Sequence, residues 1–392
     1  MSTNSAYKCS IDKMSLVVKN KETIIPTQSI VSIVIDTDYE NKIMPIIYVS
    51  LNVNLDLYNN LVKHFNDNDG KIYLNVKKYD VKVNNPIKED KIKNQFIYFI
   101  PSNATYIKDL GTDEDNKSNS YIKITMGLMD MKLLEYKKKT FNTVYRNIDS
   151  KNLINIITSG RELIMSPLDT NTHYDEFIMP PITSRSEALD YIFDNDPFFD
   201  TMYTYFTDFD KNYLINRKGF YTDKKMNTVF IDIKSIDSRS SYYEGITVDT
   251  KKNCYTMFLN PDDKKITPNK VTEKVTNKII GVYQDSVTEM DLNVNNSKYS
   301  DNSKPLFIRA DLANTSVVRS KIEATSVILN LTKANIDADI FTPDKAYTIS
   351  NYDADKEYNG RYILIYKKEV IGKMDNEYAT NTIMGLRYVG KN

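Results

Sequence analysis

The chain has 392 residues, enough for two or three domains that each bury a core of their own. It carries 52 Lys and Arg against 52 Asp and Glu, so its formal net charge is zero, and 41% of its residues are hydrophobic. This balance excludes a function that depends on bulk electrostatic attraction to DNA, RNA or an anionic membrane.

Cysteine content and hydropathy indicate where the chain is made. Cys9 and Cys254 are too few for a disulfide framework and predict unpaired thiols in a reducing compartment. No apolar run approaches the roughly 18 residues of a membrane-spanning helix. Residues 1–13 are polar and lack the apolar stretch of a signal peptide. We therefore expect a soluble protein without a membrane segment, synthesised in the cytoplasm.

The first third of the chain predicts β-structure. Segments rich in β-branched and aromatic residues are Ser29–Asp36, Ile43–Val53, Lys71–Val83, Gln95–Ile100 and Tyr121–Tyr136. A polar turn at residues 66–70 and an acidic loop at residues 111–120 lie between them. This spacing of strands and turns predicts a small barrel or sandwich over residues 1–140.

Residues 141–200 predict a helical or mixed connector. Asp149 and Ser150 can cap a short helix that runs through Ile157. Further on, a double proline at residues 180–181 ends an extended segment. Ser184 and Glu187 then form a capping box before a second helix with an apolar face.

Strands return in the last part of the chain. The predicted strands are Thr201–Phe206, Asn212–Asn216, Thr228–Lys234, Tyr242–Val248, Asn253–Leu259, Leu306–Arg309, Val317–Leu331, Asn335–Ile340, Ala346–Ser350, Arg361–Val370 and Thr382–Val389. Turns are predicted at Thr342–Lys345 and at Asn359–Gly360. We assign residues 201–260 and 305–392 to a second β-barrel domain, and residues 261–304 to a polar insertion around a strand near Ile279–Tyr283.

Two motifs carry a resemblance to a known family. Residues 177–193 read F-I-M-P-P-I-T-S-R-S-E-A-L-D-Y-I-F and precede the aromatic hairpin Y-F-T-D-F-D-K-N-Y-L of residues 205–214. Residues 343–349 read P-D-K-A-Y-T-I, and residues 358–364 read Y-N-G-R-Y-I-L. In this order and spacing they resemble the baseplate hub proteins of contractile-tailed bacteriophages.

The resemblance implies a mainly β fold with two tail-tube-like antiparallel barrels and a short helical connector. It implies a structural protein without enzymatic activity or cofactor, located in the baseplate of the virion tail. Three copies would form a ring that joins the six-fold tail tube to the three-fold central spike and lines the DNA channel without binding DNA specifically. The partners it implies are the tail tube protein, the central spike protein, the baseplate wedge proteins and the tape-measure protein. No internal sequence repeat reveals the duplication.

The residues themselves offer little for catalysis or metal binding. The histidines, His64 and His173, lie in polar runs and are predicted at the surface. No zinc, non-haem iron, Walker A or Rossmann spacing occurs, so we expect no catalytic, cofactor-binding or metal-binding residue. Residues 208–219 begin like a calcium loop, but Tyr213 stands where glycine is needed and Gly219 where the bidentate glutamate is needed.

Two carboxylate pairs are compatible with an alternative function. Asp208 with Asp210, and Asp337 with Asp339, would share one face of a strand, and we interpret each as a solvated face. The alternative function is a host-binding or cell-wall-degrading tail-tip protein that uses such a pair as a hydrolase does. The aromatic residues of 198–213 are predicted to pack in a core, because the charges between them are acidic and would repel a nucleic acid. The hub of a contractile bacteriocin or injection machine fits the same features.

Overall fold

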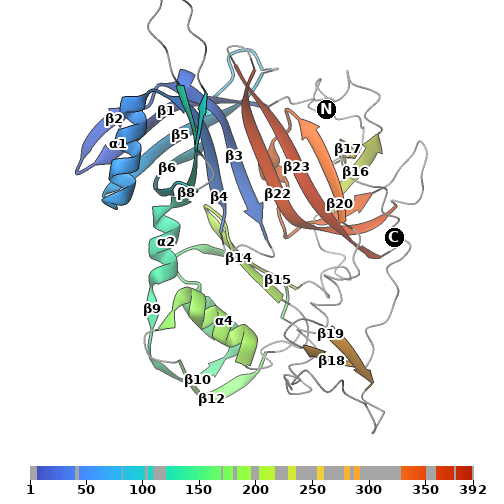
Figure 1. Cartoon of the computed structure of the whole chain (residues 1–392). Coiled ribbons are helices and arrows are strands. Elements are labelled where there is room, and N and C mark those ends of the chain that lie inside the picture. The colour runs from blue at the N-terminus through green and yellow to red at the C-terminus, as the bar shows by residue number, and fades with distance from the viewer. Residues whose placement is uncertain are drawn as a thin grey trace, which may run out of the picture.

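The computed structural model describes residues 7–39, 44–81, 83–101, 105–108, 121–168, 171–179, 183–195, 203–216, 228–234, 254–259, 278–282, 287–291, 328–349, 359–374 and 377–390. This part of the chain is mainly β-structure with four short α-helices (Figure 1), which confirms the predicted fold class. No helix within these ranges has both the length and the apolar character needed to cross a bilayer.

A first ring of strands encloses a hydrophobic core. Its strands are β1 (Tyr7–Val18), β3 (Ile30–Asp38), β4 (Ile46–Val53), β5 (Gly70–Asp80), β6 (Glu89–Phe99) and β8 (Tyr121–Asp130), with β22 (Gly360–Met374) and β23 (Glu377–Gly390). Pairing runs in the order β1–β5–β6–β8–β4–β3–β22–β23, and β23 returns to β1 at Tyr378 and Cys9. Alternate residues such as Met14, Leu74 and Phe96 point inward and are fully buried.

A second ring uses the other end of the same hairpin. β16 (Thr228–Lys234), β17 (Cys254–Leu259), β20 (Ile328–Ala334) and β21 (Ala346–Ile349) pair in the order β22–β21–β16–β17–β20–β23. β16 is parallel to both neighbours, whereas the other pairs are antiparallel. The core of this ring includes Ile231, Leu331 and Tyr347.

The hairpin of β22 and β23 belongs to both rings. Residues 366–372 of β22 pair with β3, and residues 360–362 pair with β21. Ile371 accordingly packs in the first core, whereas Leu364 packs in the second. Backbone hydrogen bonds therefore join the two barrels directly, and Figure 1 shows the two long strands passing between them.

Each barrel contains the same arrangement of an aromatic ring over a glycine. In the first, Phe99 lies opposite Gly127 and reaches across it to the ring of Tyr48 on the next strand. In the second, Tyr366 lies opposite Gly385 and reaches across it, donating a hydrogen bond to Asn330 on the next strand. Both glycines stand in a Met-Gly-Leu triplet, at residues 126–128 and 384–386.

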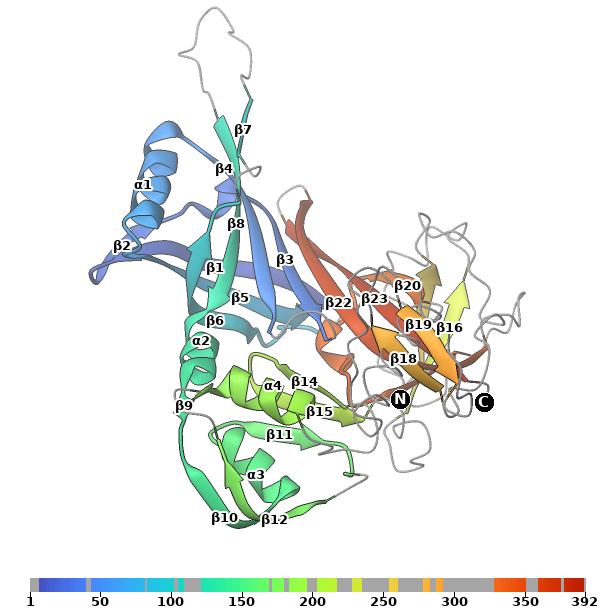
Figure 2. The same cartoon turned by 60° about the horizontal axis from the view of Figure 1, so that its bottom comes forward.

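A smaller mixed region lies beside the barrels (Figure 2). Its elements are β9 (Thr140–Phe141), β10 (Val144–Asp149), α3 (Ser150–Ile157), β11 (Glu162–Met165), β12 (His173–Ile178), β13 (Thr183–Ser184), α4 (Arg185–Asn195), β14 (Tyr203–Thr207) and β15 (Lys211–Asn216). β15 pairs with β11 on one side and with β14 on the other, in a three-stranded sheet separate from both rings. Phe206 and Tyr213 of this hairpin pack in the second barrel's core, whereas Tyr203 and Leu214 pack in the core of the mixed region. These buried positions confirm that the aromatic residues of this hairpin serve packing.

Several predicted local structures are confirmed. The backbone N–H of Ser184 donates to Glu187 Oε2 (2.7 Å) and that of Glu187 donates to Ser184 Oγ (3.3 Å), so the capping box is present at α4. Asp149 caps α3 through the N–H of Asn152 (2.7 Å). The proline turn closes with the N–H of Lys345 on the carbonyl of Thr342 (3.3 Å). In the insertion, β18 (Lys278–Val282) pairs with β19 (Val287–Asp291), and the rest of residues 261–304 lies outside the described part.

Other predictions were wrong. The strand predicted over Tyr121–Tyr136 ends at Asp130, because this side chain accepts from the N–H of Leu133 (3.0 Å) and begins helix α2 (Met131–Lys138). The strand predicted over Asn335–Ile340 is a 3-10 turn, η4 (Ala338–Ile340). The predicted strands Tyr242–Val248, Leu306–Arg309 and most of Val317–Leu331 lie outside the described residues.

Several elements of the structure were not predicted from the sequence. Among them are β1 (Tyr7–Val18), the edge strands β2 (Lys21–Ile24) and β7 (Thr105–Lys108), the strands β10 and β11 of the mixed region, the 3-10 turn η1 (Thr27–Ser29) and α1 (Leu55–Asn66). The signal for α1 was present: Asn54 caps it by accepting from the N–H of Leu57 (2.9 Å), and Leu57, Tyr58 and Leu61 form one apolar side against the first barrel.

Asn54→Ala is expected to lower the free energy of unfolding by about 1 kcal/mol, because an N–H of the first turn of α1 loses its acceptor. Urea denaturation followed by circular dichroism measures the change. The control is Asn59→Ala, an exposed position inside the same helix, which is expected to leave the stability unchanged or to raise it slightly. Equal losses in both variants would contradict the capping role.

Candidate functional site: a carboxylate–lysine network between the barrels

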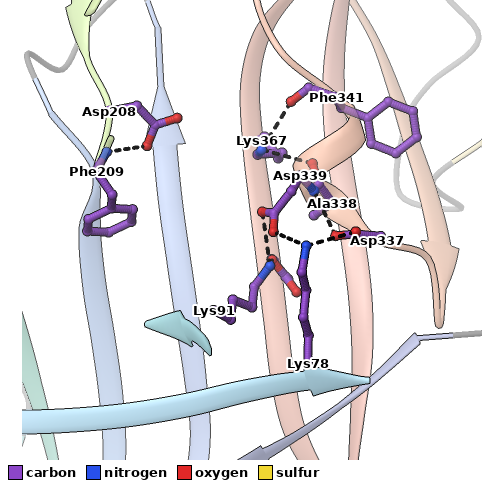
Figure 3. A network of polar contacts seen from close by, with 10 residues as sticks. Lys78, Lys91, Asp208, Phe209, Asp337, Ala338, Asp339, Phe341 and Lys367 are labelled. Atoms are coloured by element: carbon purple, nitrogen blue, oxygen red, sulfur yellow. Dashed lines mark hydrogen bonds and ion pairs between the residues drawn. The ribbon is translucent and has the colours of Figure 1, made fainter. Parts of the chain in front are cut away.

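Asp337 and Asp339, one of the two carboxylate pairs suggested by the sequence, lie together where the two barrels meet. Asp337 Oδ1 accepts from the N–H of Asp339 (3.1 Å), which fixes the turn η4 between β20 and β21. The turn places both carboxylates against the ends of β5 and β6 of the first barrel (Figure 3). The predicted solvated strand face is therefore wrong, because the two residues stand in a tight turn at a junction.

Two lysines of the first barrel form ion pairs with these carboxylates. Lys78 Nζ on β5 lies 3.0 Å from Asp337 Oδ2 and 2.8 Å from Asp339 Oδ2. Lys91 Nζ on β6 lies 3.1 Å from Asp339 Oδ1 and 2.8 Å from Glu369 Oε2 of the shared hairpin. The side chains of Lys91 and Glu369 are only 4% and 5% exposed. A chain of ion pairs therefore connects the first barrel with the turn of the second and with β22.

A third lysine completes the junction. Lys367 of β22 is buried and donates from Nζ to the carbonyl oxygens of Ala338 (2.9 Å) and Phe341 (3.0 Å). These carbonyls lie in and just after η4, so Lys367 holds the turn from the side opposite Lys78 (Figure 3). The turn is thus fixed by contacts from β5, β6 and β22 together.

Burial and pairing shift the pKa values in this network. Burial acts to raise the pKa of Asp339, but Lys91, Lys367 and Lys78 outweigh it and hold that pKa well below its ordinary value. For Lys91, burial acts to lower the pKa, and Glu369 with Asp339 raises it well above the ordinary value. Burial raises the pKa of Glu369 despite the opposing charge of Lys91.

These contacts determine what the network can do. A hydrolase of the carboxylate-pair type needs one carboxyl group free to donate a proton and another free to attack or to activate water. Here Asp337 and Asp339 are both held by lysines, and Asp339 is stabilised as the anion. The arrangement connects the two barrels, and the lysine contacts leave neither Asp337 nor Asp339 free to act as the acid of such a reaction.

The second candidate pair does not form a site either. Asp208 lies in the turn between β14 and β15, where its N–H donates to the carbonyl of Lys211 (2.8 Å) and its Oδ1 accepts from the N–H of Phe209 (2.8 Å). Burial raises its pKa, with Lys367 opposing the shift. Asp210 is exposed. The two side chains thus lie in different environments of one turn, and the predicted shared strand face is wrong.

The histidines differ in their surroundings. His173 is 56% exposed and lies at the surface as predicted, with its Nε2 4.0 Å from Asp175 Oδ1. His64 is only 18% exposed, and its Nδ1 lies 2.7 Å from Asp69 Oδ1, so its predicted surface position is wrong. The sequence placed it in a polar run, whereas the structure places it in the last turn of α1, against the first barrel.

Cys9 is a buried free thiol on β1. Burial, followed by the negative charge of Glu369, raises its pKa to about 12, so the thiol stays protonated and unreactive. This agrees with the predicted unpaired state of Cys9. The side chain of Cys254 lies outside the described part.

The network is expected to make stability depend on pH in a way that Asp339→Asn removes. Because the folded-state pKa of Asp339 is lowered, its contribution is fully present above the unfolded-state pKa of about 4 and is lost as the pH falls through the folded-state value. The side chain is 49% exposed, which moderates the effect. Glu369, whose pKa is raised by burial and in part by Asp339, acts in the opposite direction, so the difference between wild type and variant reports the Asp339 charge together with its effect on Glu369.

Urea denaturation of both proteins between pH 7 and pH 3 checks this prediction. The wild type is expected to be the more stable at pH 7, and the difference is expected to shrink toward pH 3. A difference that stays constant over this range would contradict a role for the Asp339 charge.

The fold and this junction define a mainly β protein in which two barrels share a hairpin. No protein-family model matches the chain, and no curated protein matches it. Solved structures do match. The tail protein from Neisseria meningitidis MC58 is 10% identical, with a TM-score of 0.46 over 97% of this chain and 96% of that chain. The 43 kDa tail protein of prophage MuSo2 from Shewanella oneidensis is 7% identical, with a TM-score of 0.45 over 97% and 99%.

A third match is a component of the type VI secretion system of Escherichia coli, described as structurally similar to the T4 bacteriophage tail proteins gp27 and gp5. It is 6% identical, with a TM-score of 0.38 over 97% of this chain and 77% of that chain. Phage tail proteins, the class that the two sequence motifs indicated, are thus among the structures to which this chain is similar.

Proposed function

We propose that this chain is the structural baseplate hub of a contractile phage tail. Three copies form a ring that joins the six-fold tail tube to the three-fold central spike and lines the DNA channel. The tube protein and the spike protein bind the two ends of this ring. Baseplate wedge proteins and the tape-measure protein are further partners. The ring is assembled in the host cytoplasm before it becomes part of the virion.

The observation that supports this proposal best is the presence of two barrels in one chain that have two features in common. Each barrel is closed by the same hairpin, and each carries a Met-Gly-Leu strand crossed by an aromatic side chain, Phe99 in one and Tyr366 in the other. Three such chains present six similar units, which matches a six-fold tube, while the assembly keeps three-fold symmetry for the spike.

The junction between the barrels supports a mechanical role. A ring that transmits load from tube to spike needs barrels that do not move relative to one another. The shared hairpin and the ion pairs of Lys78 and Lys91 supply this rigidity from two directions. A channel wall without excess positive charge would let DNA pass, and the chain's zero net charge is compatible with such a wall.

The alternative of a cell-wall-degrading tail-tip protein has less support. Its candidate carboxylates are held by lysines in one case and separated within a turn in the other. A host-binding protein would present aromatic side chains in exposed loops. Tyr203, Phe206 and Tyr213 of the aromatic hairpin are buried and are not presented in this way.

Light scattering and negative-stain microscopy of the purified full-length chain test the proposal. We expect a mass of about three times 45.4 kDa at micromolar concentration and images of three-fold rings with a central hole. A monomer without an opening, or release of fragments from peptidoglycan that is lost when Asp337 and Asp339 are changed to asparagine, would overturn it.

A further inference from the structure

We propose that His64, Asp67 and Asp69 form a binding site for one divalent transition-metal ion at the end of helix α1. One ligand atom from each residue lies within 4.8 Å of the others. His64 and Asp69 are partly buried, whereas Asp67 is exposed, so the site is open on one side. This inference is independent of the proposed hub function.

The local fold brings these ligands together. His64 stands in the last turn of α1, and Asp67 caps the helix by donating its N–H to the carbonyl of Lys63 (2.9 Å). Asn68 adopts φ 53°, so that the chain reverses and returns Asp69 to the side of His64. Gly70 begins β5 directly afterwards, at the point where a Cβ atom would lie 2.9 Å from the Cβ of His64. The ligands are therefore held close by rigid elements on both sides.

The pairing of these carboxylates differs from that of the carboxylates in the junction. In the junction between the barrels, Asp337, Asp339 and Glu369 each contact a lysine at 3.1 Å or less. Among the ion pairs of the described residues, Asp67 and Asp69 have no lysine or arginine partner. They also lie at the negative end of α1. Lys63 lies in the same last turn but forms no ion pair with either aspartate among the described residues, so a metal ion could take the place of a paired cation.

The donor set indicates the kind of ion. One imidazole nitrogen with two carboxylate oxygens suits Zn²⁺, Mn²⁺ or Ni²⁺, whereas Ca²⁺ and Mg²⁺ prefer oxygen ligands alone. The ion would lie between Nδ1 of His64 and Oδ1 of Asp69, which are 2.7 Å apart in a hydrogen bond, and would replace that bond. Its effect would be to connect the end of α1 to the start of β5.

Isothermal titration calorimetry of the full-length, untagged protein with ZnCl₂ tests the proposal. We expect one ion per chain, with an affinity that falls at least tenfold in Asp67→Asn and His64→Asn. The matched controls are His173→Asn and Asp175→Asn, which alter the other histidine–carboxylate pair, where no third ligand is near. Asp67→Asn is the principal variant, because Asp67 is exposed and its replacement leaves the helix cap in place.

A second measurement separates metal binding from a change in folding. Because the chain contains only two histidines, the ¹⁵N resonances of both rings can be followed during the titration. Zinc is expected to shift the ring signals of His64 and leave those of His173 in place. Absence of binding, an equal affinity in Asp67→Asn, or binding that shifts neither ring, as a site on the cysteines would produce, would overturn the proposal. A Ca²⁺ affinity equal to that of Zn²⁺ would also contradict the assigned role of His64.

Discussion

Lys91→Met is expected to lower the free energy of unfolding by about 3–5 kcal/mol. The side chains of Lys91 and Glu369 are almost fully buried, and their charged atoms lie 2.8 Å apart. Removing the lysine leaves a buried carboxylate without its closest cation and takes one of the cations from Asp339. Equilibrium unfolding in guanidinium chloride at neutral pH measures this loss.

A neighbouring lysine provides the control for this experiment. Lys93, two residues along β6, is 56% exposed and pairs with the exposed Asp90 at 3.1 Å. Lys93→Met is therefore expected to change the stability by only about 0–1 kcal/mol. In the double variant Lys91→Met with Glu369→Met, both charges are absent, and much of the lost stability is expected to return. A Lys91→Met variant as stable as Lys93→Met would contradict the role of the network in joining the barrels.

Gly127 and Gly385 each lie under an aromatic ring, and replacing either of them by alanine is expected to destabilise the protein by about 1–3 kcal/mol. A Cβ atom at Gly127 would overlap the ring of Phe99, and one at Gly385 would overlap the ring of Tyr366. Each ring would have to leave its place, which gives up the contact with Tyr48 in the first barrel and the hydrogen bond to Asn330 in the second. Thermal and urea denaturation of Gly127→Ala and Gly385→Ala measure the two effects.

Gly372 offers a matched control in the same hairpin, because a Cβ atom there would meet no other atom within 4 Å. Gly372→Ala is therefore expected to be neutral or to raise the stability slightly. The double variant Gly385→Ala with Tyr366→Ala removes the obstacle as well, so its loss is expected to be smaller than the sum of the two single losses. Additive losses, or equal losses at Gly372 and Gly385, would show that the ring over the glycine is unimportant.

Local structure could be predicted from the sequence where neighbouring residues decide it. Ser184 with Glu187 predicted the start of α4, and the proline turn at Thr342–Lys345 was predicted from its own residues, because their bonds close within three positions. Two of the errors arose where a side chain had two local options. Asp130 and Asp337 follow strand-like patterns, but each accepts a nearby N–H and begins a helical turn instead.

The amino-acid sequence by itself determined the mainly β class, the capped helices of the mixed region and the two motifs that resemble phage hub proteins. Only the tertiary structure decided that one hairpin closes both barrels, and that Lys78 meets Asp337 across 259 positions of the chain. The physical reason is that strand pairing and ion pairing depend on which segments lie side by side. The sequence has 52 basic residues and does not show which carboxylate each of them will contact. A helix cap, by contrast, lies within a few residues of the N–H from which it accepts a hydrogen bond.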